Sequence, residues 1–198
     1  NGLRERIDKK IPEQFSVLPK AGFEIRPVES YRAESMAGGQ YFPPSEDGKR
    51  PGIFYVNTYD LPSRKIWDME DLYLHEAIPG HCLQGIYNMR NSPDVVRSVF
   101  LNGAMIEGWA VYAETMMLEN GWGNNSAEMT LAKGVWKLRQ LANVIIDFEM
   151  QCRNASEKDI VIFLTANCFQ SSAQVQEKYH RATLSQVQLC SYYTGANA

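Results

Sequence analysis

A proline–glycine pair interrupts an otherwise helix-like stretch of this chain and limits how that stretch can fold. Residues 67–78 and 81–90 both have helical patterns, and Pro79 and Gly80 stand between them. The ring of a proline inside a helix clashes with the carbonyl four residues back, here that of His75. Gly80 then supplies the backbone freedom for a turn. We therefore predict a bulged or broken helix at this pair.

The break lies between two histidines, in the sequence LHEAIPGHC. Zinc peptidases commonly carry HExxH on a helix, where the two histidines share one face. In this HExxxxH motif His75 and His81 are six residues apart. On a straight helix that spacing would leave them about 120° apart, because each residue turns by about 100°. A break would bring both imidazoles to one pocket, so we predict that they bind one zinc ion.

A third ligand is expected because catalytic zinc usually takes three protein ligands and leaves a fourth position for water. Glu107 lies in the apolar stretch AMIEGWAVYAE, where a carboxylate is costly to bury unless it is paired or bound to a cation. Glu114 lies two turns further along the same face. It is expected to act either as a group behind the ligands or as the ligand itself.

Two other carboxylates are expected near the metal. Asp71, four residues before His75, is placed to accept a hydrogen bond from that imidazole. Glu76 is the expected general base for water activated by the metal. The alternative is that the histidines are ordinary surface or core residues and that Glu107 is a solvated position on a helix edge. The break and the carboxylate in an apolar helix together favour a metal site.

The remaining pattern predicts a mainly α fold over residues 1–198, as a single domain with a small β region near residues 50–60. The segment PGIFYVNTYD has the β-branched and aromatic content of a strand and is bounded by turn residues. From Ile66 onward the chain is expected to be helical. The further helices are expected over 94–119, over 127–150 with Ser126 as N-cap, over 160–168 after a capping box of Ser156 and Asp159, and over 171–193.

Composition excludes some classes of partner. A net charge of −3 and a pI near 5.7 give no electrostatic reason to expect nucleic-acid binding. No apolar run approaches the roughly 20 residues of a transmembrane helix. The four cysteines have no CxxC spacing and are expected to be buried small residues without a disulfide framework. His180, in the polar sequence EKYHRA, is expected to be a surface residue.

Two motifs in this order resemble a known family. HEAIPGHCLQ, followed about thirty residues later by EGWAVYAE, is similar to the HE-x-x-PGH-x-LQ and EGWA-x-Y-x-E motifs of the bacterial family DUF885. RPVES, the stretch YFPPSEDGKRPGIFYVNTYD, and the closing VQEKY and QLCSYYTG segments also resemble family blocks. The resemblance covers most of the chain.

The resemblance implies a zincin-like, mostly helical metallopeptidase domain, in proteins often expected to be secreted or lipid-anchored in the cell envelope. It implies that His75, His81 and Glu107 are the metal ligands and that Glu76 is the catalytic base. A widened histidine spacing also occurs in dipeptidyl peptidase III, with one extra residue. Because family members are usually longer, and this chain begins without a methionine, we expect it to be the C-terminal catalytic part of a longer protein whose N-terminal region adds to the cleft.

Three further residues receive roles by analogy. Tyr192 matches the tyrosine of the family's closing SY-x-x-G block and could donate a hydrogen bond to an oxyanion, or could merely pack. Asn57, on the expected strand, could bind the backbone of a peptide substrate. Gln151 stands where the family often has the histidine of a DTGLH-like run, which would alter substrate binding.

Two functions therefore remain open. The first is a zinc-dependent hydrolase that acts on a peptide or small amide substrate. The second is a non-catalytic binding protein of the cell envelope that keeps the fold, with or without the metal.

Overall fold

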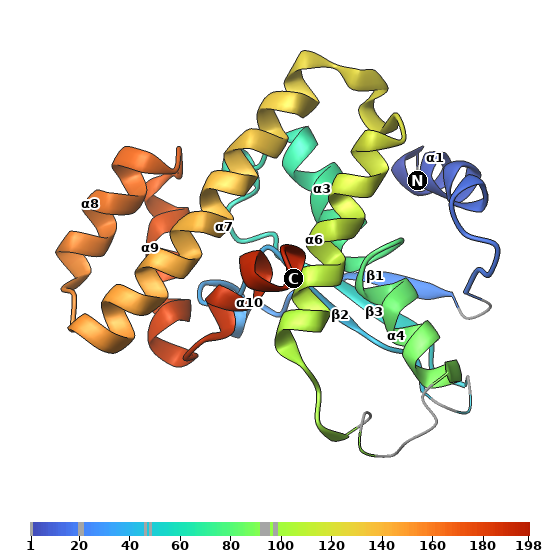
Figure 1. Cartoon of the computed structure of the whole chain (residues 1–198), viewed down its shortest axis with the longest axis horizontal. Coiled ribbons are helices and arrows are strands. Elements are labelled where there is room, and N and C mark those ends of the chain that lie inside the picture. The colour runs from blue at the N-terminus through green and yellow to red at the C-terminus, as the bar shows by residue number, and fades with distance from the viewer. Residues whose placement is uncertain (1, 20–21, 46, 48, 92–95, 97–98) are drawn as a thin grey trace.

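The computed structural model is mainly helical with one small sheet, which confirms the expected fold class (Figure 1). It describes residues 2–19, 22–45, 47, 49–91, 96 and 99–198. The α-helices are α1 (Gly2–Lys10), α2 (Ser30–Ala33), α3 (Ile66–Glu76), α4 (His81–Asn91), α6 (Gly103–Glu119), α7 (Ala127–Arg153), α8 (Glu157–Asn167), α9 (Ser172–Leu184) and α10 (Gln188–Ala196). Short 3-10 helices cover Ile11–Glu13, Leu61–Ser63 and Trp122–Asn125.

The sheet has three strands, with β3 (Gly52–Val56) in the middle. It pairs in parallel with β1 (Phe23–Pro27) and antiparallel with β2 (Gly39–Phe42). The strand expected within 51–60 is therefore present in the first half of that segment. The two outer strands were not predicted, because they are short and lie largely exposed at the edges, so they lack the alternation of a half-buried strand.

The predicted break between the two histidines is confirmed. Helix α3 ends at Glu76 and α4 begins at His81. A Cβ atom on Gly80 would lie 1.7 Å from the backbone oxygen of His75, so this turn has room only for glycine. The Gly80 N–H donates to Leu74 O over 2.9 Å. Trp109 of α6 donates its indole N–H to Pro79 O over 3.0 Å and so ties the turn to α6.

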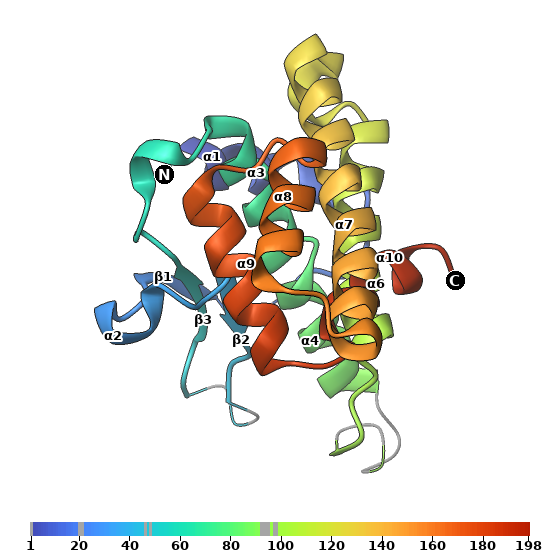
Figure 2. The same cartoon turned by 90° about the vertical axis from the view of Figure 1, so that its left-hand side faces the viewer.

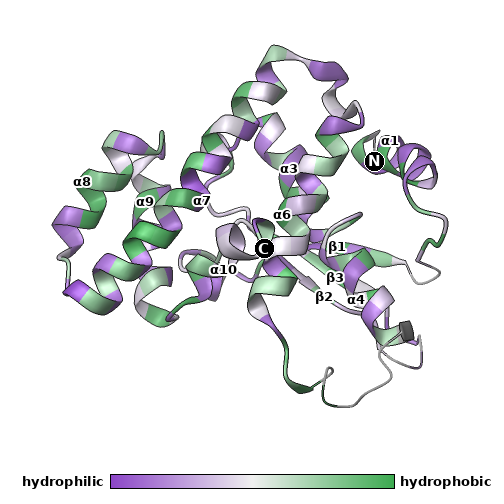
Figure 3. Ribbon diagram, in the orientation of Figure 1, coloured by the Kyte–Doolittle hydropathy of each residue, from purple (hydrophilic) through white to green (hydrophobic). Residues whose placement is uncertain are grey.

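Both predicted serine N-caps are confirmed. The Ser126 hydroxyl accepts from Met129 N at the start of α7. Ser156 and Asp159 form a complete capping box at the start of α8. Helix α7 shows bands of hydrophilic and hydrophobic residues along its length, as its sequence pattern predicts (Figure 3). Helices α8 and α9 pack against it (Figure 2).

Two of the expected helices have different bounds. The one expected over 94–119 is observed from Gly103, where the Asn102 side chain accepts from Met105 N over 3.1 Å and caps α6. Residues 94–95 and 97–98 of that expectation lie outside the described residues. The helix expected over 171–193 is two helices, α9 and α10. Val187 between them has a left-handed backbone, and its N–H donates to Asp147 of α7.

Helix α10 crosses α6, the helix that carries Glu107, at a pair of glycines (Figure 1). A Cβ atom on Gly108 of α6 would lie 2.3 Å from the carbonyl carbon of Gly195 of α10. A Cβ atom on Gly195 would lie 1.8 Å from the backbone oxygen of Ala104. The two backbones therefore touch, and neither can move aside as a flexible side chain would.

This contact predicts that alanine substitutions at two helical glycines have opposite effects on the stability of the protein. Gly108→Ala should destabilise the protein by about 1–3 kcal/mol or more, because the methyl group overlaps backbone. Gly134→Ala, on an exposed face of α7 with nothing within 4 Å, should be neutral or stabilise by up to about 1 kcal/mol. Urea unfolding of both variants measures the difference. Equal stability of the two would mean that α6 and α10 do not approach so closely.

Candidate metal centre

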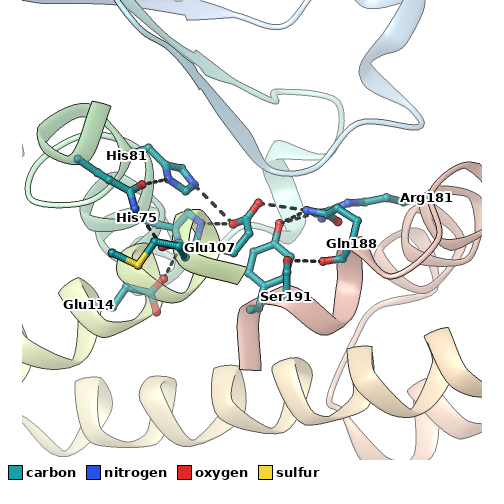
Figure 4. Close-up of polar contacts among 10 residues, drawn as sticks. His75, His81, Glu107, Glu114, Arg181, Gln188 and Ser191 are labelled. Atoms are coloured by element: carbon teal, nitrogen blue, oxygen red, sulfur yellow. Dashed lines mark hydrogen bonds and ion pairs between the residues drawn. The ribbon is translucent and has the colours of Figure 1, made fainter. Parts of the chain in front are cut away.

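Four elements bring the candidate side chains together. His75 lies in the last turn of α3 and His81 is the first residue of α4. Glu107 and Glu114 both project from α6, and Tyr192 projects from α10. The two imidazole rings lie 4.8 Å apart between centroids and nearly perpendicular, at 86°. Figure 4 shows both histidines directed at Glu107.

The Oε2 atom of Glu107 lies between the two imidazoles. It is 3.3 Å from His75 Nε2 and 3.5 Å from His81 Nε2. This oxygen is buried and has no hydrogen-bond partner in the part of the chain that the structure describes. Tetrahedral zinc at about 2.0–2.1 Å from its ligands would separate the ligand atoms by about 3.3–3.4 Å. The distances from Glu107 Oε2 to the two imidazole nitrogens therefore suit ligands of a tetrahedral cation.

Glu76 is a fourth ionisable side chain beside His75, His81 and Glu107. Its carboxylate, His75 and His81 each offer an atom within 4.8 Å of the others. Glu76 is buried but borders a cavity of about 1250 Å³, which it shares with His81, Glu107 and Tyr192. By distance alone either glutamate could be the third ligand. Glu107 fits better, because its orphan oxygen meets both imidazoles, and this leaves Glu76 beside the cavity.

Glu114 stands behind His75, on the side away from Glu107. Its Oε1 lies 2.5 Å from His75 Nδ1, while His75 Nε2 faces Glu107. The hydrogen bond that the sequence assigned to Asp71 is therefore made by Glu114. Asp71 is also buried. Its burial and the charge of the neighbouring Glu114 both raise the pKa of Asp71. A hydrogen bond of this kind orients a ligating imidazole and frees its other nitrogen for a metal.

Burial and charge act in opposite directions on the pKa values at this centre. Burial lowers the pKa of His75, but Glu107 and Glu114 on its two sides raise that pKa well above its usual value. Burial raises the pKa of Glu107, but the two imidazoles lower it by more, to below its usual range. For Asp71 and Glu114, burial dominates and raises both pKa values. A centre with this many carboxylates attracts a cation.

His81 has a supporting side chain of its own, which the sequence-based reasoning missed. Gln84 lies one turn along α4, and its Oε1 is 3.5 Å from His81 Nδ1. The Gln84 amide donates to Met105 O of α6 over 3.0 Å, which anchors it. The signal was present in the motif HEAIPGHCLQ, whose last letter is this glutamine.

Tyr192 lies at the end of the cavity where the histidines are. Its ring stacks on the imidazole of His75 with 5.9 Å between centroids and an angle of 26°. Its hydroxyl accepts from Arg181 Nη2 over 2.5 Å and from Gln188 Nε2 over 3.1 Å. Gln188 also donates to Glu107 Oε1 over 3.1 Å. Neither Arg181 nor Gln188 was singled out from the sequence, because polar residues in a polar helical stretch carry no pattern.

The two expected substrate-binding residues lie outside this group. The Asn57 side chain is buried and donates to Ala33 O and Met36 O over 2.7 and 2.8 Å, so it fastens its own loop. Gln151 on α7 donates to Ala182 O over 2.9 Å and does not border the cavity. His180 is exposed, as expected.

The remaining sequence expectations concern the cysteines and the membrane. All four cysteines are free thiols, and two of them, Cys82 and Cys168, are buried as expected. Cys152 is exposed. Among the described residues, no helix has the length and apolar character needed to cross a bilayer.

The position of Glu114 predicts a contrast between two buried acids. Glu114→Gln should weaken zinc affinity by about 10–100-fold, because His75 loses the acceptor that orients it. Asp71→Asn should change zinc affinity by less than about threefold, since Asp71 does not contact either imidazole. Competition with a chromophoric chelator measures both affinities. A larger loss in the Asp71 variant than in the Glu114 variant would contradict this arrangement.

A comparison with protein families identifies one family. The family model described as "Bacterial protein of unknown function (DUF885)" matches residues 2–198. No curated protein matches the chain. A "putative lipoprotein" from Colwellia psychrerythraea has a similar structure, with a TM-score of 0.91 and 23% identity. A "putative lipoprotein of unknown function" from Shewanella oneidensis has a TM-score of 0.72 and 35% identity.

The chain spans about one third of the length of those two proteins. All of it aligns with the Colwellia protein, of which it covers 34%. With the Shewanella protein, 99% of the chain aligns and covers 36% of that protein. The likeness to the Colwellia protein concerns the fold alone at this identity, whereas the family model matches nearly every residue. The chain therefore belongs to the DUF885 family.

Proposed function

We propose that this chain is a zinc-dependent hydrolase, and that its substrates are peptides or other small amides. One observation carries the proposal. The buried Oε2 of Glu107 makes no hydrogen bond within the described chain and lies 3.3 and 3.5 Å from the Nε2 atoms of two histidines, at the edge of a large cavity. A buried carboxylate oxygen is costly unless it meets a cation, and one oxygen with two imidazole nitrogens is a common zinc donor set.

The donor set and its surroundings indicate hydrolysis. His75, His81 and Glu107 would hold the ion, with Glu114 and Gln84 orienting the two imidazoles. Bound zinc supplies a Lewis acid that lowers the pKa of water and polarises a carbonyl. Three protein ligands would leave a coordination position for water, as in catalytic rather than structural zinc sites.

Glu76 and Tyr192 would carry the proton and charge movements. Glu76 borders the cavity within 4.8 Å of the histidine nitrogens, where it would accept a proton from the attacking water and pass it to the leaving amine. The Tyr192 hydroxyl accepts hydrogen bonds from two donors, which occupies both of its acceptor positions. Its own proton is therefore free to be donated to the oxyanion of a tetrahedral intermediate.

The location of the protein is part of the same proposal. The two similar structures are named as lipoproteins of bacteria, which supports a place in the cell envelope for this chain as well. Gln151 is one of the two features that favoured the alternative of a non-catalytic envelope protein. That residue does not border the cavity, so the departure from the family pattern does not reach the metal-binding atoms.

The proposal predicts that metal binding and turnover can be separated at Glu76. Glu76→Gln should keep its zinc but lose at least about a hundredfold in kcat, because the amide cannot accept the proton. Zinc content and cleavage of a mixed peptide library, followed by mass spectrometry, measure the two effects. Glu70→Gln, on the same helix and paired with Arg6 away from the cavity, is the control and should match the wild type.

Two results would count against the proposal. Full turnover in Glu76→Gln would remove Glu76 from the chemistry. A zinc-loaded wild type that cleaves no peptide or amide in the library would favour the non-catalytic binding protein.

A further inference from the structure

The cavity beside the histidines has an uneven charge distribution. Of the described residues that line it, Glu76 and Glu107 are acidic and lie at the histidine end. Arg181 is the one lysine or arginine among those lining residues, and it enters from α9. Figure 4 shows its guanidinium on the side of Glu107 opposite the histidines.

Arg181 has hydrogen bonds but, among the described residues, no ion pair, although the carboxylates of Glu177 and Glu107 act on its charge from a greater distance. Its Nη2 donates to Tyr192 Oη and to Gln188 Oε1 over 2.5 and 2.9 Å, both of them neutral groups. Within the described chain, no carboxylate forms an ion pair with it, and its Nη1 and Nε atoms make no hydrogen bond. An enclosed guanidinium normally meets a carboxylate or phosphate, because an unpaired charge away from bulk water is costly. The Nη1 and Nε atoms of this positively charged guanidinium are therefore available to a ligand.

The same hydrogen bonds hold Arg181 in place. Gln188 and Tyr192 lie one turn apart on α10, and both contact Nη2, while the guanidinium also lies 5.6 Å from the centre of the Tyr192 ring. A guanidinium that is already oriented loses less freedom when it binds an anion. This geometry is that of a binding group and not of a solvated surface arginine.

The distance from Arg181 to the metal-binding atoms limits which part of a substrate it can reach. Tyr192 Oη bonds to Arg181, and Gln188 Nε2 bonds both to that hydroxyl and to Glu107 Oε1, each over 3.1 Å. Hydrogen bonds of Tyr192 and Gln188 thus connect Arg181 to Glu107, a proposed metal ligand. In an N-acylated amino acid, the carboxylate carbon lies only three bonds beyond the carbonyl carbon that is attacked. An anion at Arg181 would therefore belong to the residue next to the cleaved bond.

We propose that Arg181 binds a carboxylate of the substrate, so that the cavity selects peptides or acylated amino acids whose leaving residue carries a free α-carboxylate. The cleaved bond in this statement rests on the proposed function, but the carboxylate site itself does not. The site can therefore be tested by binding alone, on protein without metal.

The experiment compares two probes that differ only in this charge. N-benzyloxycarbonyl-glycyl-phenylalanine and its C-terminal amide are titrated by calorimetry into chelator-treated protein and into zinc-loaded Glu76→Gln protein. The free acid should bind at least about tenfold more tightly than the amide in both, because charge-assisted hydrogen bonds to a guanidinium are the strong class. Arg181→Met should reduce that ratio to about one, since it keeps the apolar stem and removes the charge.

Two further variants separate direct binding from indirect effects. Tyr192→Phe removes the phenol that Arg181 touches, and it should keep the preference for the free acid because the guanidinium remains. Arg64→Met changes an arginine that lines a different, smaller cavity and should also keep the preference. Melting curves of all variants check that each is folded.

Three results would overturn the proposal. The first is equal affinity of the wild type for acid and amide. The second is a preference that survives Arg181→Met, which would leave Arg181 only the role of orienting Tyr192. The third is no binding of either probe at millimolar concentration. Because the chelator-treated protein holds no metal, these results are independent of whether zinc and hydrolysis are confirmed.

Discussion

The backbone turn between α3 and α4 is the constraint on which the rest of the centre depends. On an uninterrupted helix the two histidines would face different directions, and no single ion could bind both. The turn ends α3 at Glu76 and restarts the chain at His81, and the absence of a side chain at Gly80 lets the backbone pass against His75 O. The hydrogen bond from Trp109 to Pro79 O then holds the turn against α6, the helix that carries Glu107.

A second close approach completes the centre. The Gly108–Gly195 contact lets α10 lie directly on α6, and Tyr192 of α10 then stacks on His75. Gln188, one turn earlier, reaches Glu107. The short motifs EGWAVYAE and SYYTG are thus parts of one contact, in which the glycines permit the approach and the polar residues form the site. The candidate metal-binding atoms therefore depend on a glycine-containing turn between α3 and α4 and on a glycine-dependent crossing of α6 and α10.

Much of this centre could be predicted from sequence, because its signals are local. The break at Pro79–Gly80 and the pairing of His75 with His81 follow from helix geometry, and Glu107 follows from the cost of burying a carboxylate. The partner of His75 could not be chosen in this way. Asp71 and Glu114 are both at suitable helical spacings, and the packing of α6 on α3 decides between them.

Residues that act through tertiary contacts left no local signal. Arg181 and Gln188 reach the centre because α9 and α10 are separate helices, whereas the sequence pattern predicted one helix over 171–193. The left-handed backbone of Val187 that separates them is held by Asp147 of α7, a contact between distant parts of the chain. Asn57 shows the opposite case, since its position on a strand suggested substrate binding but its amide serves the local fold.

The most direct test of the account is the zinc content of the purified protein, measured by elemental analysis after zinc is supplied and excess removed. The account predicts about one zinc ion per chain in the wild type. It predicts less than about a tenth of that in His81→Ala, because two ligands without the second imidazole no longer form the site. His180→Ala, which removes an exposed histidine outside the centre, should keep the full amount. A wild type without zinc, or a His81→Ala protein that retains it, would contradict the claim that the turn brings His81 to a metal.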